Sequence, residues 1–246
     1  MDEMKVMDIN CDLGEGAAND EALMPLISSC NIAAGGHAGN EKTIRKTIRL
    51  AKNCQVKIGV HPSYPDRIHF GRKIPDISPD ELHRSLREQL HSFLKVADSE
   101  GIDINHIKLH GALYHQAASD KKTADIFLDT IKDFRFRGIL FVPYGSVLFR
   151  MAERTFDCYS EAFIDRAYTA NLKLLSRESP LALHHEPEKA WEQFYSISVE
   201  NKVVTIEKVK KKLIAKTCCI HGDHPNAVAI LKHIRNRANK NGIKIE

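Results

Sequence analysis

The sequence predicts an α/β fold in which helices pack around a parallel sheet. Short apolar runs recur along the 246 residues, helical patterns lie between most of them, and each run ends in glycine, proline or a polar cluster. This alternation favours parallel strands, because a crossover helix returns the chain to the start of the next strand. The spacing of these runs alone is compatible with both a closed barrel and an open, doubly wound sheet.

Seven of the apolar runs have the length expected of strands. No linker rich in proline, glycine or serine divides them, so we expect residues 1–246 to form a single domain, as barrels of this size often do. The predicted strands cover residues 6–11, 30–34, 56–60, 106–109, 139–142, 158–163 and 217–220.

The clearest helix is predicted from about Ser78 to Glu100. Ser78 and Glu81 have the spacing of a capping box, and Pro79 falls in the first turn. Apolar residues then repeat at helical spacing until Gly101, a residue typical of helix ends. Weaker helical patterns cover residues 41–54, 121–134, 145–153, 188–199 and 226–239.

Composition and charge exclude several classes of partner. The chain is 43% hydrophobic and 28% charged, with a net charge of +4, which is too mild to indicate nucleic-acid binding. The basic run 208–216 interleaves lysine with valine and leucine, so we interpret it as a solvated strand or hairpin. No stretch approaches the roughly 18 apolar residues of a membrane span, and no secretory cleavage pattern is present. We expect a cytoplasmic protein with neither nucleic acid nor membrane as partner.

Cysteine and histidine placement gives two smaller predictions. The six cysteines lack a C-x-x-C pair, so we expect small buried side chains rather than a zinc site. His184 and His185 precede Glu186 and Pro187 in a predicted helix-entry loop, where we expect both histidines at the surface.

Acids, imidazoles and a lysine follow six of the seven predicted strands. In parallel α/β folds, ligands bind at the carboxyl ends of strands, where the following loops converge. The residues at these positions are Asn10, Asp12 and Glu15; Asn31, His37 and Asn40; His61, Ser63, Tyr64 and Asp66; Lys108, His110 and Tyr114; Glu161, Asp165 and Arg166; and His221, Asp223 and His224.

Residues 105–115 carry the two most reactive side chains of this set. Alternation along a strand places Lys108 and His110 on one face and Ile107 and Leu109 on the other. A lysine beside a histidine suits acid–base chemistry, because burial or a neighbouring charge can move either pKa toward neutrality. Considered alone, the stretch is more typical of an edge strand with one solvated face.

A divalent metal site is one interpretation of these strand ends. Asp12, His37, His61 and His110 supply the imidazole and carboxylate ligands that zinc and similar ions prefer. Such an ion would acidify water into a nucleophile near neutral pH. Their spacing fits no standard helical metal motif.

A metal-free site is the competing interpretation. There Asp12 or Glu15 acts as the base and an imidazole shuttles the proton, while Lys108 and Arg166 hold an anion. Residues 36–43 nearly match a phosphate-binding loop, but Glu41 stands where that loop requires glycine. The glycines before it could still bind an anion at a helix start.

Six ordered motifs resemble the LamB/YcsF family, and together they run from about Met7 to the C-terminus. The motifs are DINCDLGEG, SCNIAAGGHAGN, GVHPSYPDRIHFGR, HIKLHGALYHQAA, EAFIDRAY and CIHGDHPNAVAIL. The resemblance implies a distorted seven-stranded parallel βα barrel similar to glycoside hydrolase and deacetylase folds. It also implies ATP-dependent opening of 5-oxo-L-proline (pyroglutamate) to L-glutamate, carried out with two partner subunits, B and C.

The resemblance also implies site residues. Lys108 and Arg166 are the candidates for stabilising negative charge once ATP has activated the lactam oxygen, and Asp12, His61 and His110 are the candidates for activating water. The catalytic set is therefore Asp12, His61, Lys108 and His110. The substrate-binding candidates are Glu15, Asn31, His37, Tyr114, Glu161, Asp165, Arg166, His221 and Asp223. ATP is the cofactor implied for the complex, and a divalent metal stays open.

Several positions depart from the family pattern. Gly36 stands for an aromatic residue and should widen or loosen the pocket, while Asn40 stands for an aspartate and removes a carboxylate. Ala34, Cys11 and Leu109 are further departures. Two alternatives therefore remain: a metal-dependent amide or acetyl hydrolase that acts alone, and a binding subunit without catalysis. The sequence is also compatible with a homo-oligomer of this chain.

Overall fold

The seven predicted strands close into a parallel barrel. In the computed structural model, which describes residues 5–246, they lie in the order β1-β2-β3-β4-β5-β6-β9, and β9 pairs with β1 to complete the ring. The strands are β1 (Lys5–Leu13), β2 (Ser29–Ala33), β3 (Lys57–His61), β4 (His106–Lys108), β5 (Ile139–Pro143), β6 (Asp157–Phe163) and β9 (Thr217–His221). The β1–β9 pairing confirms the barrel and excludes the open sheet. A short β10 (Ile243–Ile245) pairs with the start of β1.

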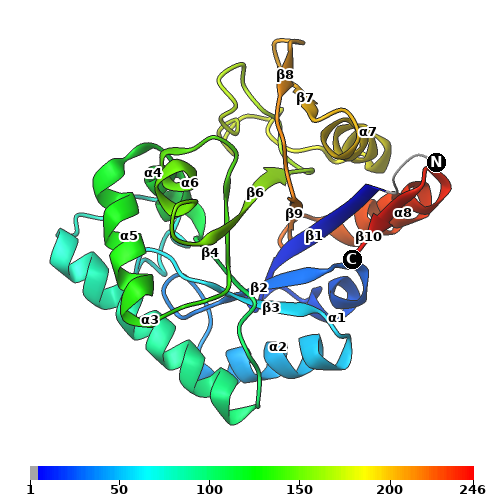
Figure 1. Ribbon diagram of the computed structural model, residues 1–246. Coiled ribbons are helices and arrows are strands. Elements are labelled where there is room, and N and C mark those ends of the chain that lie inside the picture. The colour runs from blue at the N-terminus through cyan, green and yellow to red at the C-terminus, as the bar shows by residue number, and fades with distance from the viewer. Residues whose placement is uncertain (1–4) are drawn as a thin grey trace.

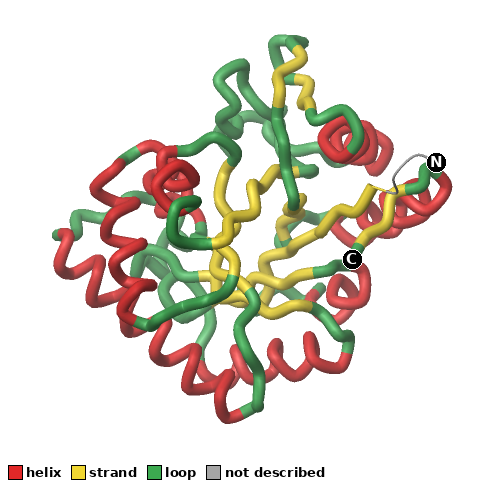
Figure 2. The backbone as a smooth tube through the Cα atoms, viewed as in Figure 1, coloured by secondary structure: helices red, strands yellow, loops and turns green. Residues whose placement is uncertain are grey.

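Helices surround these strands, as Figures 1 and 2 show. All six predicted helical segments are confirmed, within a few residues at each end. They are α2 (Glu41–Asn53), α3 (Pro79–Ser99), α5 (Lys121–Asp133), α6 (Val147–Ala152), α7 (Pro187–Ser198) and α8 (Ala227–Lys240). The sequence did not predict α4 (Gly111–Ser119), the short α1 (Asp20–Leu23) or the 3₁₀ helix η1 (Met24–Leu26).

Helix α3 has the ends that its sequence predicts. The Ser78 hydroxyl accepts a hydrogen bond from the backbone N–H of Glu81, whose side chain in turn accepts from the backbone N–H of Ser78. Gly101 follows the helix with φ of +66°, a conformation that glycine adopts without strain. These local signals fix where α3 begins and ends.

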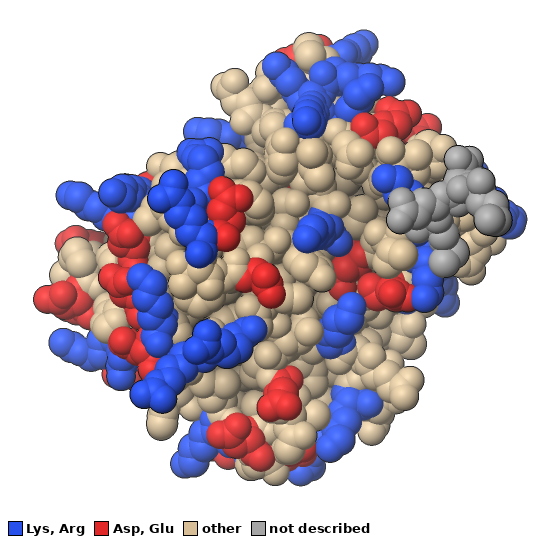
Figure 3. Space-filling view, viewed as in Figure 1, with Lys and Arg blue, Asp and Glu red and all other residues tan. Residues whose placement is uncertain are grey.

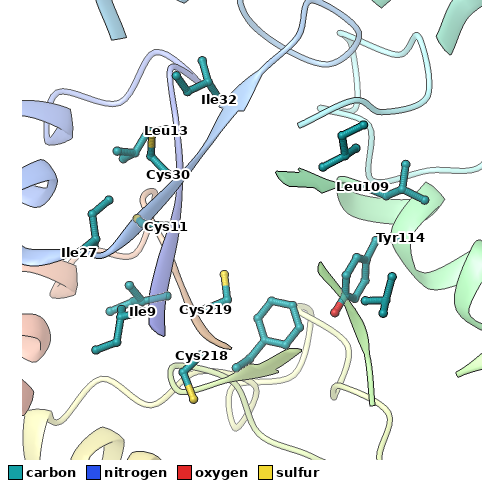
Figure 4. Close-up of a cluster of buried hydrophobic side chains, with 14 of the residues drawn as sticks. Ile9, Cys11, Leu13, Ile27, Cys30, Ile32, Leu109, Tyr114, Cys218 and Cys219 are labelled. Atoms are coloured by element: carbon teal, nitrogen blue, oxygen red, sulfur yellow. The ribbon is translucent and has the colours of Figure 1, made fainter. Parts of the chain in front are cut away.

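Strand β1 separates the apolar shell from the barrel interior. Ile9, Cys11 and Leu13 lie on one side of β1, as Figure 4 shows, within the hydrophobic core. The alternate residues Asn10 and Asp12 are also buried, but they bond to polar groups of other strands. Because side chains alternate along a strand, an outward apolar face leaves the inward face for chemistry.

The basic run 208–216 forms half of a hairpin outside the barrel. Strand β7 (Lys202–Val204) pairs antiparallel with β8 (Lys210–Lys212), which confirms the predicted strand or hairpin. Lys and Arg side chains gather at the top of Figure 3, where the hairpin lies in the same view of Figure 1, whereas both signs of charge are mixed over the rest of that face.

The cysteines are free thiols throughout the described chain. Four of them are buried as predicted, but Cys54 and Cys158 are only partly buried. No helix within residues 5–246 combines the length and apolar character needed to cross a membrane.

The prediction that His184 lies at the surface is wrong, whereas His185 is exposed. His184 is buried, and its Nε2 lies 3.1 Å from Oε1 of Gln193 on α7. Burial is the main cause of the lowered pKa of His184. The loop that precedes α7 folds back on the helix, which the sequence spacing does not reveal.

Candidate functional site

The candidate site lies at the carboxyl ends of the barrel strands. Asp12 at the end of β1 pairs in register with His221 at the end of β9. His61 ends β3, and His110 follows β4 directly. The closed barrel thus brings together residues that are up to about two hundred positions apart in the sequence, as the general architecture of such folds predicts.

Lys108 is the central charge of the barrel interior. Its side chain is only 2% exposed, and Nζ lies 2.9 Å from Asp12 Oδ1 and 3.0 Å from Glu161 Oε1. It also lies 3.2 Å from Asn10 Oδ1 and 2.9 Å from Cys219 Sγ. An ammonium group has three N–H donors, so these neighbours leave none free for a substrate.

The surroundings of Lys108 keep it charged. Burial alone would lower its pKa, but the charges of Asp12 and Glu161 raise the pKa well above its ordinary value. The ammonium group therefore holds Asp12 in place through its Oδ1 atom. As predicted, Lys108 and His110 both face the interior, and Leu109 belongs to the apolar core.

A network of amides fixes Asp12 from the neighbouring strands. Asn31 Nδ2 donates to Asp12 Oδ1 at 2.8 Å and to Asn10 Oδ1 at 2.7 Å. Asn10 in turn donates to Glu161 Oε1 at 2.9 Å, and His106 Nε2 lies 2.8 Å from Asn31 Oδ1. Asn31 therefore orients Asp12 directly. The predicted site residue Glu161 belongs to the same hydrogen-bond network through Asn10.

Two histidines, His61 and His110, face each other beside Asp12. His61 Nδ1 donates to the Lys108 carbonyl at 2.8 Å, and His110 Nε2 donates to the Phe70 carbonyl at 2.9 Å. Since a carbonyl only accepts, the protons sit on these two outer nitrogens. The inner nitrogens, His61 Nε2 and His110 Nδ1, are 3.0 Å apart. Both therefore offer lone pairs to the same point, unless one proton is shared between them.

Two carboxylates complete this group. Asp12 Oδ2 lies 3.4 Å from His61 Nε2, and Glu15 Oε1 lies 3.4 Å from His110 Nδ1. One ligand atom from each of the four residues lies within 4.8 Å of all the others. Two imidazoles held by backbone carbonyls together with two carboxylates form a donor set that fits a divalent cation.

The metal set predicted from the sequence needs one correction, because Glu15 occupies the position given to His37. The His37 ring instead stacks on His110 with centroids 3.6 Å apart, and its Nε2 lies 2.9 Å from Glu15 Oε1. His37 Nδ1 is buried and has no hydrogen-bond partner in the described chain. Burial lowers the pKa of His37 to about 4, so the neutral ring holds Glu15 in position.

The two carboxylates of the group differ in proton affinity. Burial and then the charge of Asp12 raise the pKa of Glu15 to about 7, although His61 opposes this. Burial would also raise the pKa of Asp12, but His61 and Lys108 lower it well below the usual value. Without a metal, Asp12 would stay ionised and Glu15 could exchange protons near neutral pH.

A second acid–imidazole pair adjoins the first group. Asp165 Oδ2 accepts from the backbone N–H of His221 at 3.1 Å and lies 2.8 Å from His221 Nδ1. The Asp165 side chain is fully buried, while that of His221 is 14% exposed. Burial would raise the pKa of Asp165, but His221 lowers it well below the usual value. A carboxylate on Nδ1 fixes the tautomer and orientation of an imidazole, leaving Nε2 for proton transfer.

Two arginines that the sequence patterns did not indicate lie beside this pair. Arg72 Nη2 and Arg177 Nη1 both donate to Asp223 Oδ2, at 2.5 and 3.2 Å. Arg72 ends one of the six family-like motifs, so the motif itself could have revealed it. Arg177 lies between motifs, and the sequence contains no signal for it.

Two other predicted residues lie in the interior and in a loop. Tyr114 on α4 is buried, its hydroxyl has no hydrogen-bond partner among residues 5–246, and burial raises its pKa well above the usual value, with Glu161 adding to the rise. Asp66 accepts from the backbone N–H of His69 and so stabilises its own turn. Neither residue belongs to the four-residue group of Asp12.

The two informative departures from the family pattern have structural explanations. The prediction that Gly36 widens the pocket is wrong, because a Cβ there would lie 2.4 Å from Ser63 Oγ and 2.5 Å from Gln89 Oε1. These side chains fill the space. Asn40 is exposed, and its side chain caps α2 by accepting from the backbone N–H of Thr43 at 3.0 Å. The side chain of Asn40 therefore satisfies one of the N–H groups at the start of α2 that we had considered for anion binding.

Known proteins resemble the chain over nearly its whole length. The A subunit of 5-oxoprolinase from Haemophilus influenzae (strain PittEE) is 38% identical over 243 residues, which cover 98% of this chain and 99% of that protein. The protein of the same name from Symbiobacterium thermophilum is 35% identical over 248 residues, covering 98% and 95%. The solved structure of a lactam utilization protein from Thermus thermophilus has a TM-score of 0.90 at 32% identity, covering 98% of both chains.

More distant structures share the fold alone. A family 4 carbohydrate esterase from Streptomyces lividans has a TM-score of 0.52 at 6% identity. The GH20 catalytic modules of the pneumococcal exo-β-D-N-acetylglucosaminidase StrH give 0.54 at 8% identity. The predicted similarity to deacetylase and glycoside hydrolase barrels is thus confirmed. Residues 7–246 match the LamB/YcsF family, and with relatives of 35–38% identity over nearly the full length, the chain belongs to the LamB/YcsF family.

Proposed function

We propose that the chain is the A subunit of a 5-oxoprolinase, which uses ATP to hydrolyse 5-oxo-L-proline to L-glutamate together with subunits B and C. The observation that carries this proposal is the 38% identity, over 98% of the chain, to a protein named as the A subunit of 5-oxoprolinase. We further propose that residues 1–246 act as one domain in the cytoplasm. One core cluster from Met7 to Ile243 and six free thiols support this.

The group of Asp12, Glu15, His61 and His110 is suited to activating water. Opening a lactam requires a water oxygen to bond to the carbonyl carbon, the ring C–N bond to break, and the nitrogen to gain a proton. Without a metal, Lys108 holds Asp12 ionised, and the inner nitrogens of His61 and His110 are positioned to accept the proton of the water. When bound by these four residues, a divalent ion would supply Lewis acidity and acidify that water.

The pair of Asp165 and His221 is suited to the opposite proton transfer. His221 lies beside Asp12 across the β1–β9 pairing, so it adjoins the same space. With Asp165 accepting from Nδ1, the imidazolium form of His221 can give its Nε2 proton to the departing ring nitrogen, which leaves the imidazole ring neutral. Arg166 is our candidate for stabilising negative charge on the substrate. Lys108 acts through Asp12 and is therefore a positioning residue.

The experiment that tests the proposal is subunit omission. The chain is combined with subunits B and C, 5-oxo-L-proline and ATP, and L-glutamate is measured. We expect glutamate only when all three subunits and ATP are present. Equal glutamate formation by B and C without this chain would contradict the proposal, as would release by this chain alone without ATP.

A metal-dependent amide or acetyl hydrolase that acts alone is the second candidate function. The donor set of Asp12, Glu15, His61 and His110 favours it. Such an enzyme would hydrolyse an acetamide or lactam without partners and would lose this activity to a chelator. The binding subunit without catalysis loses its support, since Gly36 packs against Gln89 and Asn40 caps a helix.

A further inference from the structure

Three arginines from two loops gather at the edge of the site. Arg72 lies in the loop after β3, whereas Arg166 and Arg177 lie in the segment after β6. The guanidinium groups of Arg72 and Arg177 share one oxygen of Asp223. Because each guanidinium has five N–H donors, this contact leaves donors of both arginines for another anion.

Arg166 is the buried member of this cluster. It is 4% exposed, and its Nη2 donates to the Leu175 carbonyl at 2.6 Å. Its Nε is buried without a hydrogen-bond partner among the described residues. Burial is the main cause of its lowered pKa, the charge of Arg177 is the next, and Asp165 opposes both. The Leu175 carbonyl that accepts from Arg166 lies two residues before Arg177 in the chain, so both arginines border the same segment.

The charges of the cluster do not balance. Arg72 and Arg177 share the carboxylate of Asp223, whereas Arg166 is hydrogen-bonded to a backbone carbonyl and to no carboxylate of the described residues. A partly desolvated cation without a counter-ion is costly, and a buried donor without an acceptor adds to this cost. The cluster therefore complements a monoanion.

We propose that Arg72, Arg166 and Arg177 bind the carboxylate of the substrate. This inference rests on the proposed function, because 5-oxo-L-proline carries one carboxylate beside its lactam ring. A planar guanidinium matches a carboxylate with paired hydrogen bonds. Asp223, which binds both Arg72 and Arg177, comes two residues after His221, so an anchored carboxylate lies at the same loop as His221. Asp223 holds Arg72 and Arg177 for this contact.

The test compares three probes by calorimetric titration of the full chain: 5-oxo-L-proline, its carboxamide and inorganic phosphate. We expect the wild-type chain to bind the acid at least about tenfold more tightly than the carboxamide. Arg177→Ala should weaken acid binding about tenfold to a hundredfold, the effect of a lost charged hydrogen bond. Carboxamide binding should stay the same, and Arg177→Lys should be intermediate.

Controls keep the inference falsifiable. Arg177 is partly exposed, so its variants are expected to fold, and Arg154→Ala, an exposed arginine before β6, should bind like the wild type. Equal affinity of the wild-type chain for acid and amide would overturn the inference, as would equal weakening of both by Arg177→Ala. Phosphate that binds and is not displaced by the acid would also overturn it, since the cluster would then serve a phosphoryl group.

The inference and the proposed function fail in different experiments. A complex that forms glutamate while Arg177→Ala still distinguishes acid from amide would leave the function standing and remove the carboxylate site. A chain that distinguishes the two probes through Arg177, in a complex that forms no glutamate, would keep the carboxylate site and remove the function.

Discussion

Lys108 Nζ and Asp12 Oδ1 lie 2.9 Å apart in the barrel interior, where the two side chains are only 2% and 5% exposed. Buried ion pairs of this kind are expensive to break, because the remaining partner keeps its charge without water. The pair thus couples the stability of the barrel to the ionised state of the site carboxylate.

Replacement of Lys108 should destabilise the whole fold. Lys108→Met leaves Asp12 and Glu161 as uncompensated buried carboxylates, so we expect the free energy of unfolding to fall by about 3–5 kcal/mol. Urea denaturation measures this change. Adding Glu161→Gln should restore part of the loss, since one of the two unpaired charges is then removed. A loss below about 1 kcal/mol would show that the interior is open to water.

Gly36 should resist even a methyl group. In Gly36→Ala, the new Cβ would overlap Ser63 Oγ and Gln89 Oε1, so we expect a loss of about 1–3 kcal/mol in unfolding free energy. The same substitution in a Gln89→Ala background should cost less, because the side chain of Gln89 is then shortened. An unchanged stability for Gly36→Ala would support the looser pocket that the sequence indicated.

Asp165 should affect the rate of the reaction rather than substrate binding. Asp165→Asn removes the carboxylate that orients His221, so we expect kcat of the three-subunit complex to fall about 10²- to 10⁴-fold. KM should change little, and the near-ultraviolet circular dichroism should be retained. His221→Gln should cause a similar loss, and the double variant should lose no more than either single variant. Additive losses would mean that the two residues act separately.

Glu100 gives a pH dependence that is independent of the site. Its carboxylate bonds to Arg49 at 2.8 Å and to Arg45 at 2.6 Å, joining α2 to α3. Hydrogen bonds from Arg49 and then Arg45 lower its pKa from 4.5 to about 2. A carboxyl with a lowered folded-state pKa stabilises the protein above its unfolded-state pKa, and this contribution disappears as the pH falls through the folded-state value.

Glu100→Gln should therefore lower thermal stability by a constant amount above about pH 5.5, and the difference from the wild type should shrink between about pH 4.5 and 2. Thermal melts across this range measure the effect. Glu88→Gln, an exposed position on α3, serves as the matched control. A difference that grows as the pH falls would contradict this account.

Much of the fold could be predicted from the sequence because its signals are local. Strand runs, the capping box of Ser78 and the end at Gly101 each depend on neighbouring residues, and the structure reproduces them. Barrel closure depends on the pairing of β1 with β9, which brings distant parts of the chain into register at Asp8 and Thr217. Only the family resemblance could indicate that pairing in advance.

The candidate site was predictable in residue type but not in detail. Alternation correctly placed Lys108 and His110 inside, whereas the choice between Glu15 and His37 depends on how the loops after β1 and β2 fold over the barrel end. The prediction that Gly36 widens the pocket was wrong for a similar reason, because the neighbouring side chain of Gln89 comes from α3. The sequence could not identify Arg177 as a site residue, because that assignment depends on its contact with Asp223, which is visible only in the structure.

The most direct test of the central claim is glutamate formation by complexes that contain His61→Ala or His110→Ala. If the carboxyl end of this barrel performs the hydrolysis, each variant should lower kcat at least about a hundredfold. His233→Ala, an outer position on α8 bonded to Glu188, should leave the rate unchanged. Near-normal glutamate formation by folded His61→Ala and His110→Ala complexes would contradict the account.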